Sequence, residues 1–163
     1  MNRVRQEKNI RNIVALERII TLGDTLDAQQ KETVKAIELF SSFLDMSPVV
    51  AWIKDFNGKF VWVNARLCRV FERPSEHWIG KSDYDFLPEE TARMITENDR
   101  IVMDTGDILH LNEQVPTPDA KMHEWVVFKF PVTVNLIKYV GGMAMDINIV
   151  ESEIVTCDEE NDA

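Results

Sequence analysis

The spacing of apolar residues changes at Val49, and this change limits the fold more than any other feature of the sequence. Before it, apolar side chains recur every three or four residues, which is typical of helices. After it, they alternate with polar side chains over several segments, which indicates strands. The sequence therefore predicts an N-terminal helical segment followed by a domain built on a sheet.

The helical segment covers residues 4–46. The run 23–25, Gly-Asp-Thr, interrupts its apolar spacing and offers a new N-cap, so we expect two helices or one kinked helix. Ser47 and Pro48 end the second helix. Neither helix has enough partners to be stable alone. Residues 1–46 are therefore expected to form an N-terminal extension that packs against another surface.

Alternation predicts five strands, two before an irregular connector and three after it. These strands are residues 49–54, 59–63, 109–115, 122–130 and 137–147. Asn57 and Gly58 are a strong hairpin signal between the first two strands. Pro88 opens a helix that Gly106 ends, and this helix precedes the last three strands. The fold class is therefore α+β, a five-stranded antiparallel sheet with helices over one face.

The charge of the chain restricts its partners. With a formal net charge of -10 over 163 residues, we expect no nucleic acid and no membrane contact, because phosphate binding needs clustered Lys and Arg. Residues 151–163 carry six acidic side chains and no base, which predicts a flexible acidic tail after a globular domain at 47–150. Cys68 and Cys157 match no ligand spacing, which indicates reduced thiols and a cytoplasmic location.

Four segments of the chain resemble PAS domains. The segment 52–64, from Trp52 to Asn64, resembles their opening hairpin, and 80–88, Gly-Lys-Ser-Asp-Tyr-Asp-Phe-Leu-Pro, is similar to their connector. The segments 115–119 and 141–147 look like their later strand regions, and all four occur in the family's order. The chain departs from the family at 119–121 and 133–136, where glycine-containing turns are usual.

This resemblance implies a sensory or interaction module of a signalling protein. PAS domains commonly bind a small molecule between sheet and helices, form homodimers through flanking helices, and pass a conformational change to an output domain. The fold alone assigns no ligand.

The helix over 89–105 supplies candidate contacts for an interior site. Its apolar side includes Met94 and Val102, and Asn98 falls within the same stripe. A buried amide needs hydrogen-bond partners. Asn98 is therefore either a ligand contact or the donor of a structural hydrogen bond to the connector or the sheet.

Strand alternation predicts the other interior side chains. In 122–130, Lys129 is expected to point to water, so Trp125 points outward with it and Phe128 points inward. In 137–147, the same argument places Met143 inward. The candidate ligand-binding residues are Phe71, Tyr84, Phe86, Met94, Asn98, Val102, Leu111, Phe128 and Met143. A filled core without a ligand is the alternative.

The same reasoning places Trp52 beside Lys54 and Trp125 beside Lys129 on the outer sheet face. Exposed indole rings would form a large apolar patch, which the N-terminal helices or a second subunit should cover. The candidate interface residues are Ile13, Ile20, Val34, Ile37, Trp52 and Trp125.

The sequence lacks the motifs of catalysis and of common cofactors. It has no nucleophile elbow, phosphate-binding loop, metal motif or dinucleotide fingerprint, so we expect no enzyme and no metal site. Haem is unexpected, because it would need an axial histidine near the interior site and the helix 89–105 has none. Flavin is unexpected as well, because the residues around Cys68 lack the Asn-Cys-Arg-Phe-Leu-Gln pattern of the PAS domains that react with flavin. Asp83 and Asp85 are interpreted as turn-forming residues.

Two functions remain open. The first is a dimeric sensory domain that binds a small, mostly apolar molecule in its core and regulates an output module. The second is a ligand-free interaction module that acts by dimerisation alone.

Overall fold

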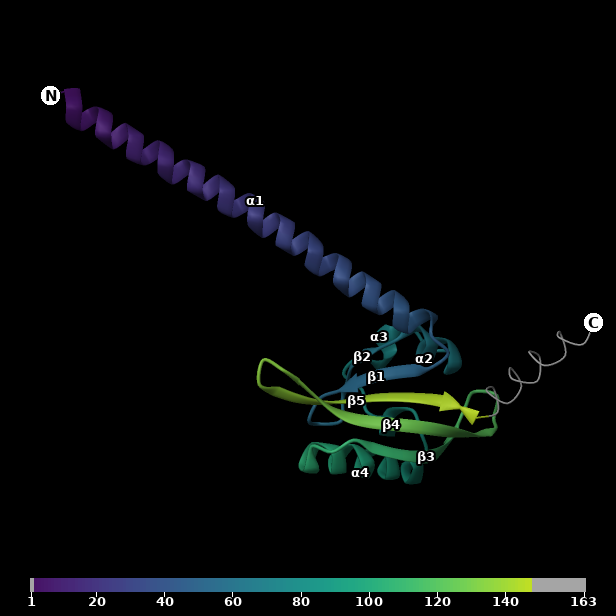
Figure 1. Cartoon of the computed structure of the whole chain (residues 1–163). Coiled ribbons are helices and arrows are strands. Elements are labelled where there is room, and N and C mark those ends of the chain that lie inside the picture. Colours follow the sequence, from purple (N-terminus) through teal and green to yellow (C-terminus); the bar gives the residue numbers. More distant parts are fainter. Residues whose placement is uncertain (1, 148–163) are drawn as a thin grey trace, which may run out of the picture. The chain divides into compact units, whose positions relative to one another are not determined.

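The computed structural model describes residues 2–147 (Figure 1). Within the first helix it describes the side chains of Arg18 and Leu22 and of the residues from Asp24 onward. The chain divides between Ser42 and Phe43 into two compact units. None of the described helices combines the length and the apolarity needed to cross a membrane. The predicted acidic tail, 151–163, lies outside the described residues.

The first unit is formed by most of α1 (Asn2–Met46). The helix continues past Gly23, so the prediction of a second helix starting near residue 25 is wrong. A single glycine costs a helix interior only about 1 kcal/mol relative to alanine, and two good helix formers, Leu22 and Leu26, lie within one turn of it. The helix ends at Met46, as the following Ser-Pro pair predicts.

Two of the predicted interface residues in α1 are open to solvent in the single chain. Val34 is 48% exposed and Ile37 is 61% exposed. The other two, Ile13 and Ile20, lie outside the described side chains. The interface itself stays a prediction.

The second unit is built on a five-stranded antiparallel sheet with the order β2-β1-β5-β4-β3 (Figure 1). The strands are β1 (Val50–Lys54), β2 (Phe60–Val63), β3 (Leu109–Pro116), β4 (Met122–Val134) and β5 (Ile137–Asp146). The last strand lies beside the first, so both ends of the domain meet at the centre of the sheet. The predicted five-stranded antiparallel sheet is confirmed.

Three short helices and one long helix contact one face of this sheet. They are α2 (Ala65–Val70), α3 (Ser75–Trp78), the 3₁₀ helix η1 (Asp83–Asp85) and α4 (Glu89–Thr105). Leu67, Trp78 and Ile95 from three of them belong to one core cluster with sheet residues. Pro88 precedes α4 and Gly106 ends it with a φ of 75°, as predicted.

The predicted facing of β1, β4 and β5 is wrong. The face toward the helices carries Trp52 and Lys54 in β1 and Trp125 and Lys129 in β4, all four buried. Strand alternation then places Phe128 on the opposite face. In β1 and β4 the prediction failed because it kept both lysines in water, whereas each is paired with carboxylates inside the domain. In β5 it failed because Asp146, which it also turned to water, is buried beside His123.

In β3 the two faces alternate as strand geometry requires, since Glu113 and Val115 are buried while His110, Asn112 and Gln114 are exposed.

Candidate functional site

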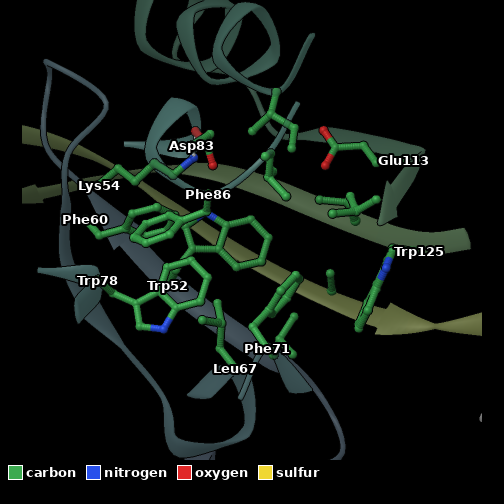
Figure 2. Close-up of a pocket in the computed structure, with 16 residues that line it drawn as sticks. Trp52, Lys54, Phe60, Leu67, Phe71, Trp78, Asp83, Phe86, Glu113 and Trp125 are labelled. Atoms are coloured by element: carbon green, nitrogen blue, oxygen red, sulfur yellow. Dashed lines mark hydrogen bonds and ion pairs between the residues drawn. The ribbon is translucent and has the colours of Figure 1, made fainter. Parts of the chain in front are cut away.

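A cavity of about 70 Å³ lies between the sheet and the helices of the second unit (Figure 2). Its aromatic wall consists of Trp52, Phe60, Phe71, Trp78, Phe86 and Trp125. Its aliphatic wall consists of Val50, Leu67, Leu87, Ile95, Val115, Val127 and Ala144. Three charged residues complete the lining: Lys54, Asp83 and Glu113. The site is therefore an apolar chamber with charged groups in its wall.

The aromatic rings contact one another edge to face. Trp78 lies 5.2 Å from Phe60 and 5.6 Å from Phe71 between ring centroids, with interplanar angles of 74° and 79°. It lies 4.5 Å from Phe86 at a tilt of 46°. Aromatic rings prefer such edge-to-face and offset geometries. The connector residues Trp78 and Phe86 thus close the chamber opposite the sheet.

Gly142 makes room for the largest of the sheet side chains. A Cβ atom at Gly142 would collide with the indole ring of Trp52. The two residues are direct partners in the pairing of β1 with β5. Absence of a side chain at Gly142 therefore lets the Trp52 ring lie against β5 on the inner face.

Asn64 connects the wall of the cavity to the end of α1. Its side-chain oxygen accepts hydrogen bonds from the backbone N–H groups of Ala51 and Leu67, both at 3.0 Å. Its amide group donates to the carbonyl oxygens of Leu44, at 2.9 Å, and Val49, at 3.0 Å. Asn64 is thus the N-cap of α2. The same side chain also fixes β1 and the last turn of α1, which belongs to the second unit.

A chain of buried ion pairs crosses one side of the cavity. Lys54 Nζ lies 2.5 Å from Asp83 Oδ2 and 2.8 Å from Asp99 Oδ2. Lys129 Nζ lies 2.9 Å from Asp99 Oδ1 and 2.9 Å from Glu113 Oε1. All five side chains are at most 8% exposed. We call these five residues the charge cluster; it joins β1, η1, α4, β3 and β4.

The pKa values in this cluster follow from burial and from the neighbouring charges. Burial alone would lower the pKa of Lys54, but Asp99 and Asp83 outweigh it and raise that pKa. Burial would likewise raise the pKa of Asp99, but Lys54 and Lys129 lower it. For Asp83, burial prevails over Lys54 and raises the pKa. Asp99 is thus held as a carboxylate between two ammonium groups.

Among the candidate ligand-binding residues, Phe71 and Phe86 line the cavity. Tyr84, on η1, is 50% exposed and does not line it. Asp85 forms the predicted turn, because its carboxylate accepts hydrogen bonds from both the backbone N–H and the hydroxyl of Ser82. The 3₁₀ turn directs Asp83 inward instead of Tyr84.

The three candidates on α4 do not line the cavity. Met94 is 36% exposed, and Val102 is fully buried elsewhere in the core. Asn98 Nδ2 donates to Glu113 Oε1 at 3.0 Å, which is the structural hydrogen bond to the sheet that the sequence left open. Its neighbour Asp99 is the residue of α4 whose carboxylate pairs with both buried lysines.

The three strand candidates also lie outside the cavity lining. Leu111 is on the predicted inner face but is only partly buried. Phe128 is 42% exposed and stacks on His110, with 4.5 Å between ring centroids. Met143 pairs directly with Phe128 on the same outer face. The wrong choice of Phe128 and Met143 follows from the wrong facing predicted for β4 and β5.

Trp52 and Trp125 were predicted for an outer interface, and the structure places them in the cavity wall instead. They are only 9% and 4% exposed. The sequence held one signal for this arrangement: Asp99 follows Ile95 and precedes Val102 at helical spacing, so a carboxylate occupies a core position of α4. A carboxylate in such a position calls for a buried cation, and the strand lysines are the nearest candidates.

Residues 44–148 match the family model described as the PAS fold. The methanogenesis regulatory histidine kinase FilI of Methanothrix harundinacea is 29% identical over 87 residues, which are 53% of this chain and 10% of FilI. The chain spans about a tenth of the length of the curated relatives it matches.

Solved structures, PAS domains among them, share the fold. The PAS domain of the HTR-like protein from Haloarcula marismortui superposes with a TM-score of 0.62 at 14% identity, over 74% of this chain and 99% of that chain. VqmA bound to DPO, a protein of Vibrio cholerae, gives a TM-score of 0.61 at 24% identity, over 71% of this chain and 58% of that chain. At 14% and 24% sequence identity, these comparisons show a shared fold and nothing further.

Proposed function

The chain belongs to the PAS fold family, and on that premise we propose that its second unit is a sensory domain, which binds a small molecule in the cavity and regulates an output module. Signalling proteins are among its relatives, including the regulatory histidine kinase FilI. One protein of similar fold, VqmA, has been solved bound to DPO. Both likenesses support a sensory role.

The observation that carries the proposal is the position of the cavity. Side chains of all five strands and of α2, α3, η1 and α4 reach it, so a molecule entering there contacts every one of these elements. Apolar chambers with a few polar groups are the usual form of small-molecule sites. A chamber of about 70 Å³ is about half the size of an engineered cavity that takes benzene, so entry of a ligand displaces part of the wall.

The displacement has a route to the N-terminal helix. Leu67 lines the cavity, and its backbone N–H donates to Asn64, whose amide donates to the carbonyl oxygen of Leu44 in α1. Arg69 Nη2 in α2 also donates to the carbonyl oxygen of Asp45, at 2.7 Å. A shift of α2 therefore alters the hydrogen bonds of the last turn of α1.

We propose that α1 pairs with a second copy of the chain and carries the signal along the helix. Several of its apolar side chains are exposed in the single chain: Leu22, Leu26, Val34, Ile37, Leu39 and Phe40. A helix that exposes such residues gains stability when a partner covers them. We also propose that the domain is regulatory rather than catalytic and acts in the cytoplasm, where a free thiol such as Cys68 stays reduced.

A ligand-free interaction module is the second candidate, and one observation favours it. The outer sheet face carries the 42% exposed Phe128, together with the half-buried Trp62 and Met143. Such a face suits protein contacts. In this reading the cavity is a packing defect of the core.

Native mass spectrometry of the protein purified from its host separates the two candidates. We expect a bound small molecule in the wild-type chain. Ala144→Phe, which fills the cavity from β5, should lose that mass, while Met143→Phe on the opposite face should retain it. A wild-type chain without bound mass favours the interaction module, and the oligomeric state in the same spectrum tests the dimer.

A further inference from the structure

Three indole N–H groups in the cavity wall have no hydrogen-bond acceptor among the described residues. They belong to Trp52, Trp78 and Trp125, each at least nine-tenths buried. In Figure 2 the nitrogen of Trp125 lies at the end of its ring nearest Glu113, its direct partner across β3 and β4. All three residues line the same chamber.

Buried donors without acceptors are rare in folded proteins, because each loses its bond to water without gaining another. Tyr and Trp normally direct their polar atoms to a partner when they are buried. One unpaired indole could be a local defect of packing. Because the three residues line one chamber, a single molecule lying there is the simplest common source of acceptor atoms.

The charge cluster decides which kind of acceptor the chamber tolerates. Its three carboxylates and two ammonium groups give a formal charge of -1, and all five groups are already paired with one another. An anionic ligand would add a second buried negative charge beside Asp83 and Glu113, which line the cavity. A neutral acceptor avoids this cost.

The aromatic wall favours a flat ligand. The rings of Phe71 and Trp125 are nearly parallel, with an interplanar angle of 19°, and their centroids lie 6.5 Å apart. A planar ring packs well on such faces and needs the least displacement of the wall.

We propose that the cavity binds a neutral, planar aromatic molecule that bears hydrogen-bond acceptors, and that the indole N–H groups of Trp52, Trp78 and Trp125 donate to it. The proposal rests on the proposed sensory function and names its class of ligand.

Three compounds of one ring and similar size test the class: acetophenone, which is neutral and has a carbonyl acceptor, ethylbenzene, which has none, and benzoate, which is anionic. Calorimetry with the full chain should show a dissociation constant for acetophenone about tenfold lower than that for ethylbenzene. This difference corresponds to the net free energy of one or two buried hydrogen bonds. Benzoate should bind more weakly than acetophenone.

Two variants locate the preference. Trp125→Phe keeps an aromatic ring in the wall but removes one N–H, and it should reduce the preference for acetophenone over ethylbenzene. Trp62→Phe, on the outer sheet face, is the matched control and should leave it unchanged. If Trp125→Phe fails to fold, Trp78→Phe replaces it, and the comparison of the three compounds on the wild-type chain needs no variant.

The outcomes distinguish the two levels of the proposal. Ethylbenzene or benzoate binding as tightly as acetophenone overturns the ligand class but leaves a small-molecule site. If none of the three binds while the host-purified chain carries a bound molecule, the class is again wrong and the sensory function stands. If there is neither binding nor bound mass, both are wrong.

Discussion

Lys129 is the buried cation whose removal should destabilise the domain most. Its side chain is fully buried, and its ammonium group lies 2.9 Å from both Asp99 and Glu113 and 3.2 Å from the carbonyl oxygen of Ile95. Lys129→Met keeps most of the stem but leaves the cluster with three carboxylates and one ammonium group. Because removing one partner of a buried pair leaves an uncompensated charge, we expect the free energy of unfolding to fall by about 3–5 kcal/mol.

Urea unfolding followed by tryptophan fluorescence measures this change. The matched control is Lys138→Met on β5, an exposed lysine of the same sheet, which should cost less than about 0.5 kcal/mol. Adding Glu113→Gln to Lys129→Met removes the uncompensated carboxylate and should recover part of the loss. A loss below about 1 kcal/mol for Lys129→Met, similar to that of a surface ion pair, would refute the reasoning.

Two further predictions concern the surface of the domain. The pKa of His123 is raised by its hydrogen bonds to Asp146 and Asp119. The contribution of His123 to stability is therefore fully present below the ordinary pKa of 6.5 and is lost as pH rises through the raised value. Wild type and His123→Gln should differ most in urea unfolding below pH 6.5, and a difference that grows with pH would contradict this. Leu136 is 95% exposed and has a φ of 66° in the turn between β4 and β5. Leu136→Gly should therefore relieve backbone strain and raise stability by about 0.5–1 kcal/mol, measured by thermal melting. A lower melting temperature for this variant would count against the prediction.

The order of helices and strands could be predicted because its signals are local. Asn57 and Gly58 lie in the loop of the first hairpin, and Pro88 and Gly106 bound α4 within one residue. Gly23 was the exception, because a glycine breaks a helix only when nothing on either side favours continuation.

The facing of the strands could not be predicted from local spacing. Lys54 is paired with carboxylates 29 and 45 residues away in the sequence, and a lysine without visible partners is rightly expected in water. Once Lys54 and Lys129 were placed outside, Trp52 and Trp125 followed them by alternation. One wrong assumption about two charges therefore moved two tryptophans of the cavity wall to the outer face.

The candidate site was predicted best where no strand facing was involved. Phe71, Tyr84 and Phe86 were chosen together from the segments after the first hairpin, and the two phenylalanines line the cavity while Tyr84 does not. On α4 the prediction named Asn98 and passed over Asp99, although helical spacing puts the Asp99 carboxylate in the core, where it pairs with lysines of two strands.

The indole resonances of the four tryptophans test the central claim most directly. In a two-dimensional ¹H–¹⁵N NMR spectrum, each indole N–H gives one signal, and acetophenone serves as the probe ligand. The account predicts that the signals of Trp52, Trp78 and Trp125 shift on binding while that of Trp62, outside the cavity, stays in place. A shift confined to Trp62, or no shift at any of the four, would contradict a ligand site in this cavity.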